Sequence, residues 1–129
     1  MKLNKYYLSI LVIIISLSSF GQEVSKEKES KKVVEMTQDA DQTMKENLNL
    51  SVDQIPKVSE INLAFSKKMV TLFKAPGSMF GKIGDVKKNM KDRNLQFKKV
   101  LTEEQMKVFK DKIESKLRKN MKKIMKSDS

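Results

Sequence analysis

Leu50-Ser51-Val52-Asp53-Gln54 and Leu101-Thr102-Glu103-Glu104-Gln105 are two copies, 51 residues apart, of one pattern, L-[S/T]-x-x-Q. Ser and Thr are good N-cap residues, because the side-chain oxygen accepts from a free backbone N–H in the first turn of a helix. A Gln three residues later can accept from the N–H of the cap, which completes a capping box. The sequence therefore predicts two similar helical turns at corresponding places.

The residues on either side of each box favour the same interpretation. Leu50 and Leu101 directly precede the caps, and the apolar residues Ile55 and Met106 stand at the N4 positions. This pairing is typical of a hydrophobic staple, which fixes the angle at which the chain enters a helix.

The N-terminus has the features of a secretory signal peptide. Lys2 and Lys5 precede an apolar run over residues 6–17, and the small residues Ser19 and Gly21 suit cleavage before Gln22. An uncleaved anchor is the alternative, but the run is shorter than the roughly 20 residues that a membrane-spanning helix needs. We therefore expect a signal peptide over residues 1–21, cleavage near Gly21-Gln22, and an exported, periplasmic protein.

The composition argues against an enzyme. The chain has no His and no Cys, so the commonest metal ligands and most nucleophile–base pairs are absent. The acids are scattered among lysines on helical faces, where solvation and surface ion pairs are their usual roles. The sequence predicts no catalytic site, no metal site and no cofactor.

Helical spacing covers the remainder of the chain, and no β pattern is present. Apolar residues recur every three or four positions, which predicts about four helices in a single all-α domain over residues 22–129. The predicted helices begin near Lys31, at Ser51, at Asp85 and at Thr102. Residues 22–30 are expected to be flexible. A loop is expected over residues 75–84, where Met79, Phe80 and Ile83 either fold back over the core, the favoured alternative, or offer a contact site.

Two apolar stripes carry most of this prediction. The first helix has Val33, Met36, Ala40, Met44 and Leu48, and the last has Met106, Phe109, Ile113, Leu117, Met121 and Ile124. The stripe of the third helix skips a turn at Arg93-Asn94. Pro56 lies near the start of the second helix and predicts either a kink or a helix that begins only there.

In a small, exported, Lys- and Met-rich helical chain, the doubled pattern resembles the Spy/CpxP family of periplasmic proteins. The resemblance implies long, bent helical hairpins and an antiparallel, cradle-like homodimer. It also implies ATP-independent binding of unfolded proteins, or regulation of an envelope-stress system. The motif residues are architectural in this interpretation: Leu50, Ser51, Gln54, Leu101, Thr102 and Gln105. Two ordinary helix caps would be the alternative explanation of the pattern. Pro56 departs from the family pattern.

The basic charge lies in one half of the chain. Residues 22–81 carry nine Lys and nine acids, whereas residues 82–129 carry sixteen Lys or Arg and seven acids, a net charge of +9. Such a surface attracts acidic protein segments, anionic lipid or nucleic acid, or only keeps the protein soluble. Export argues against nucleic acid as the main partner.

Methionine is flexible and recurs on surfaces that accept many partners. We therefore expect unfolded client proteins to bind through basic, Met and Phe side chains of the last two helices. The candidates are Lys87, Lys88, Lys91, Arg93, Lys107, Lys110, Lys116, Arg118, Met79, Phe80 and Met90. Two alternatives remain open: a regulator that docks on a membrane sensor domain, and a basic protein of the membrane surface or envelope structure.

The caps generate a first testable prediction. Thr102→Ala removes the acceptor at the start of the last helix and should lower the free energy of unfolding by roughly 1 kcal/mol, a typical N-cap effect. Urea or thermal unfolding measures this loss. A change within error of zero would mean that Thr102 caps no helix.

Overall fold

A computed structural model describes residues 20–127, with side chains from residue 27 onward. These residues form α2 Phe20–Leu48, α3 Gln54–Lys74, α4 Met79–Val100, α5 Glu103–Val108, the π-helical turn η1 Phe109–Ile113 and α6 Glu114–Lys126. The all-α prediction is confirmed, since the described part of the chain contains no strand. The predicted signal peptide lies outside the described residues, apart from Phe20 and Gly21.

The chain divides into two units, residues 1–30 and residues 31–129. In the first unit the described residues are helical from Phe20. The expected helix start near Lys31 is therefore wrong.

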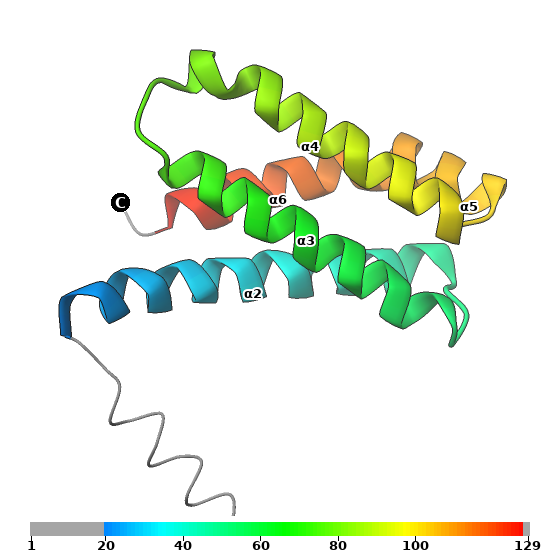
Figure 1. The fold of residues 1–129 in the computed structure, drawn as a ribbon. Coiled ribbons are helices and arrows are strands. Elements are labelled where there is room, and N and C mark those ends of the chain that lie inside the picture. Colours follow the sequence, from blue (N-terminus) through cyan, green and yellow to red (C-terminus); the bar gives the residue numbers. More distant parts are fainter. Residues whose placement is uncertain (1–19, 128–129) are drawn as a thin grey trace, which may run out of the picture. The chain divides into compact units, whose positions relative to one another are not determined.

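The second unit consists of two helical hairpins. The first joins the end of α2 to α3, and the second joins α4 to the segment α5, η1 and α6, which follow one another without a break. Figure 1 shows the two hairpin turns at the same end of this unit, and the short connection from α3 to α4 at the other end. Each hairpin turn is one copy of the L-[S/T]-x-x-Q pattern.

Both capping boxes are present. Ser51 Oγ accepts from the N–H of Gln54 at 3.2 Å, and Gln54 Oε1 accepts from the N–H of Ser51 at 3.0 Å. Thr102 and Gln105 repeat this arrangement at 3.1 and 3.0 Å. The first box includes a loose turn, because α3 itself begins at Gln54. Pro56 therefore falls in the first turn of α3, where a missing N–H is tolerated.

The two glutamines also bind each other across the molecule. Gln54 Nε2 donates to Gln105 Oε1 at 2.7 Å, and Gln105 Nε2 donates to Gln54 Oε1 at 3.1 Å. Each Nε2 has a second acceptor at the end of a helix in the other hairpin: Val100 O for Gln54 at 3.0 Å, and Leu48 O for Gln105 at 3.1 Å. Both amides thus use all their donors and acceptors, and they join the two turns.

The core of this unit has two apolar clusters. The cluster near the hairpin turns contains Met44, Phe97 and Phe109, and the cluster nearer the other end contains Met69, Val70 and Met121. The predicted apolar stripes of the first and last helices are buried, which confirms them. The rings of Phe97 and Phe109 pack in an edge-to-face arrangement, with their centroids 5.0 Å apart.

Polar side chains also connect the helices. Asp41 on α2 accepts from Ser59 Oγ at 2.6 Å and from Asn62 Nδ2 at 2.8 Å, both on α3. Asp39 accepts from Asn120 Nδ2 on α6 at 3.0 Å. The expectation that the acids serve only in solvation and surface pairs is therefore wrong for these two. Two residues apart, they point to different helices and fix α2 against both.

The connection between α3 and α4 is shorter than predicted. It spans only residues 75–78, with Gly77 at a φ of +115°, and α4 begins at Met79 with Ser78 at its cap. Gly81 and Gly84 lie inside α4 rather than in a loop. Met79, Phe80 and Ile83 do not fold over the core. They are 49%, 88% and 41% exposed.

The π-helical turn η1 explains how the last apolar stripe stays buried. Phe109, Ile113, Leu117 and Met121 are each four residues apart, and on an ideal α-helix three such steps drift by about 120° around the axis. The wider turn at 109–113 takes up part of this drift. All four side chains therefore remain in the core.

The glutamine pair generates a second prediction. Gln105→Glu keeps the acceptor for the N–H of Thr102 but cannot donate to Leu48 O and Gln54 Oε1. It should therefore lower the free energy of unfolding by about 2 kcal/mol, roughly 1 kcal/mol for each hydrogen bond lost. Urea unfolding measures the loss, and Gln96→Glu, an exposed glutamine on α4, controls for the added charge.

A double variant separates the pair from the two caps. Gln54→Ala and Gln105→Ala should each lower the free energy of unfolding, and the loss in the double variant should be smaller than their sum, because both changes break the same two hydrogen bonds. Additive losses would show that the two turns are stabilised independently.

Candidate functional site

Arg93 fills the turn that the apolar stripe of α4 skips. The residue is 6% exposed, and its guanidinium carbon lies 4.4 Å from the ring centre of Phe65 and 5.2 Å from that of Phe109. Burial lowers the pKa of Arg93 to about 10, although the charge of Glu114 opposes this shift. The side chain therefore stays a cation at neutral pH, held between two aromatic faces.

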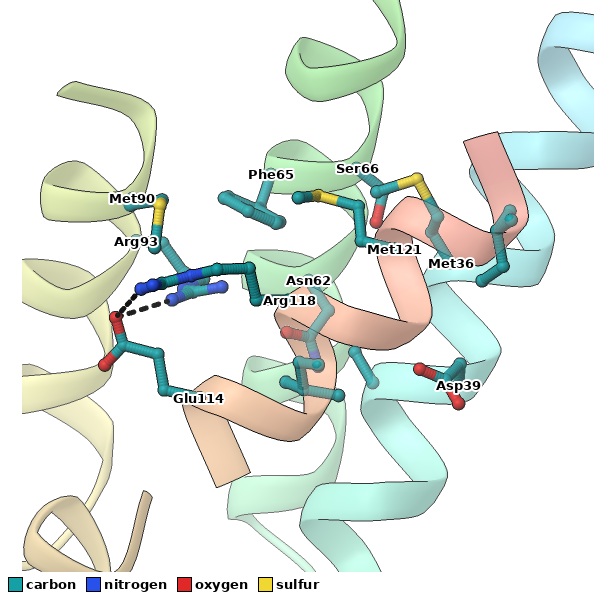
Figure 2. A pocket seen from close by; sticks show the side chains of 13 residues that line it. Met36, Asp39, Asn62, Phe65, Ser66, Met90, Arg93, Glu114, Arg118 and Met121 are labelled. Atoms are coloured by element: carbon teal, nitrogen blue, oxygen red, sulfur yellow. Dashed lines mark ion pairs between the residues drawn. The ribbon is translucent and has the colours of Figure 1, made fainter. Parts of the chain in front are cut away.

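Glu114 is the counter-ion of this buried charge. Its Oε1 lies 3.7 Å from Nη2 of Arg93 and also 3.7 Å from Nη2 of Arg118, which is largely exposed (Figure 2). Glu114 itself keeps an 18% exposed side chain. The three residues link α4 to α6 and run from the interior to the surface.

A small cavity of about 30 Å³ lies beside this group, between α2, α3, α4 and α6. Asn62 and Arg93 both line it, and Asn62 Oδ1 and Arg93 Nη2 are buried without a hydrogen-bond partner in the protein. An acceptor and a donor at one cavity of this size are what a bridging water requires. Among the described residues, no group of His, Cys, Asp and Glu could hold a metal ion.

A much larger groove lies along α4, beside η1 and α6. Its volume is about 570 Å³. Five of its lining residues are apolar, Met79, Ile83, Val86, Met90 and Leu95, and five are basic, Lys87, Lys91, Lys98, Lys110 and Arg118. Asn94 completes the lining, and no acid takes part. We call this surface the α4 groove.

Helical spacing places the two kinds of residue on α4. Met79, Ile83, Val86 and Met90 follow one another at intervals of four, three and four, which is a single stripe. Lys87, Lys91 and Lys98 form a neighbouring stripe, while Lys110 and Arg118 come from η1 and α6. The groove therefore has an apolar floor between cations from different helices.

The sequence-predicted candidates divide into three groups. Lining the α4 groove are Lys87, Lys91, Lys110, Arg118, Met79 and Met90. Lys107 lines an adjoining, more polar hollow that shares Lys98 and Lys110 with the groove, while Lys88, Lys116 and Phe80 are exposed outside it. Arg93 is buried and does not line the groove.

Other members of the groove and the interior were not predicted. Val86, Asn94, Leu95 and Lys98 line the groove without having been singled out as candidates. For Val86, the spacing of seven residues from Met79 is a signal that could have found it once α4 was known to begin there. For Arg93, the signal was the skipped turn in the apolar stripe, because a core position cannot be left empty.

Comparison with known proteins gives no further information on the site. No protein-family model, curated protein or solved structure matches this chain. Within residues 20–127, no helix is both long enough and apolar enough to cross a membrane.

Removal of the counter-ion tests the role of Glu114. Glu114→Gln leaves the buried charge of Arg93 uncompensated and should lower the free energy of unfolding by about 3 kcal/mol. This loss is at the lower end of the range for a broken buried ion pair, because Glu114 is partly exposed. The double variant Glu114→Gln with Arg93→Met should recover most of the lost free energy of unfolding, since the buried charge of Arg93 is then removed. Arg118→Met is the control and should cost less than about 1 kcal/mol, because Arg118 is exposed. Equal losses in Glu114→Gln and Arg118→Met would contradict the argument.

Proposed function

We propose that the protein is an ATP-independent periplasmic chaperone, a holdase that binds unfolded or aggregation-prone proteins in the α4 groove. The observation that carries the proposal is the composition of this groove, an apolar floor containing two methionines and bordered by five cations, without an acid. Adaptable apolar contacts hold many different sequences, and the cations accelerate the encounter with acidic segments.

The sequence supports the same proposal independently. The signal peptide provides export, and the doubled L-[S/T]-x-x-Q pattern resembles the Spy/CpxP family, in which the homodimer and the envelope-stress role are expected. Three residues lining the groove are substantially exposed: Met79, Ile83 and Leu95 are 49%, 41% and 46% exposed. Apolar side chains gathered in this way on one surface mark interaction sites.

A charge reversal confined to the groove tests the proposal. Lys87→Glu, Lys91→Glu and Lys98→Glu combined should raise the amount of protein needed to suppress aggregation of an unfolded acidic client about tenfold, as expected for three weakened rim contacts. Light scattering of the diluted client measures this. At high salt the difference from the unchanged protein should shrink, because exposed charges are screened.

The matched control carries the same change in charge elsewhere. Lys119, Lys122 and Lys123 are exposed on α6 and do not line the groove, and reversing these three should leave suppression within about twofold. Equal losses in both triple variants would mean that net charge, and not the groove, captures the client. No suppression by the unchanged protein, with several clients, would favour the regulatory or structural alternative.

A further inference from the structure

The α4 groove offers hydrogen-bond donors and almost no acceptors. Its five cations are donors only. Asn94 contributes the one amide oxygen of the lining side chains, and this Oδ1 already accepts from Nε of Arg93 at 3.2 Å. The floor belongs to α4, whose backbone groups are bonded within the helix. A bound segment therefore finds many partners for its acceptors and very few for its N–H groups.

The shortage of hydrogen-bond acceptors in the groove affects an extended and a helical bound segment differently. An extended segment on the apolar floor would bury N–H groups without acceptors, and a buried donor without a partner is unfavourable. No strand edge is present in the described residues to pair with it. A helical segment bonds its own N–H groups internally, and its carboxylates then accept from the lysines.

We propose that the α4 groove binds an amphipathic, acidic α-helix in preference to an extended segment, an inference that rests on the proposed function. The apolar positions Met79 to Met90 give the floor a helical stripe, and the lining as a whole extends along α4 from Met79 to Lys98, about 28 Å at 1.5 Å per residue. A helix of about 18 residues spans this length. Its apolar face contacts the floor, and Glu or Asp residues beside that face meet Lys87, Lys91 and Lys98 on one side and Lys110 and Arg118 on the other.

Two labelled peptides of about 18 residues and of identical Leu, Glu and Gln content test the form of the segment. The first places Leu at helical spacing, and the second alternates Leu with polar residues, as a strand does. Fluorescence anisotropy with the protein should give at least about tenfold tighter binding of the first peptide. Circular dichroism should show that this peptide gains helix on binding. A third peptide, with Lys in place of Glu, should bind more weakly than either.

The two triple lysine variants distinguish failure of the helical preference from failure of the groove as a binding site. Binding of the helical peptide should fall with the Lys87, Lys91 and Lys98 reversal and persist with the Lys119, Lys122 and Lys123 reversal. Equal binding of both acidic peptides, each lost in the groove variant, would overturn the helical preference and leave the groove as a client site. Binding that no groove variant affects would overturn the proposed site itself.

Two other occupants would also overturn the proposal. Sedimentation with phosphatidylcholine vesicles that contain phosphatidylglycerol, lost in the groove variant while no peptide binds, would assign the groove to a membrane surface. A change in oligomeric state that is confined to the groove variant, again without peptide binding, would assign it to a second copy of the chain.

Discussion

The reciprocal hydrogen bonds between Gln54 and Gln105 are the constraint on which the rest of the second unit depends. Each glutamine caps its own helix and at the same time satisfies a carbonyl at the end of a helix in the other hairpin. A shift of one hairpin against the other by a single residue would therefore leave donors and acceptors of both turns unpaired. The pair fixes the register of two hairpins that are otherwise held by apolar contacts, which lack direction.

Further along the helices, a layer of polar side chains also fixes how the two hairpins pack against each other. Asp39, Asp41, Asn62, Arg93 and Glu114 lie among the contacts between α2, α3, α4 and α6. Such groups add little stability compared with apolar residues of equal size, but they are unfavourable in any arrangement that leaves them unpaired. Met90 and Arg118 line both the cavity beside this layer and the α4 groove. The layer thus fixes the floor of the groove from within.

Local patterns in the sequence were sufficient for the buried apolar stripes and the two capping boxes, because a capping box and a stripe at helical spacing depend on neighbouring residues only. They could not show that Gln54 meets Gln105, since that contact joins residues 51 positions apart. The start of α4 was mispredicted because Gly81 and Gly84 are poor helix formers, while Met79 to Met90 has a helical spacing that outweighs them. Arg93 looked like a surface cation, and only the tertiary packing of Phe65 and Phe109 around it makes it interior.

Arg118 connects the interior to the proposed binding surface. It lines the α4 groove, and its Nη2 shares Glu114 Oε1 with the buried Arg93. A client carboxylate that approached Arg118 would compete with Glu114 for this guanidinium. Glu114 would then remain as the counter-ion of Arg93 alone, whose charge cannot leave the interior. The buried charge therefore keeps Glu114 in place, so that Arg118 can turn toward a bound segment without disturbing the core.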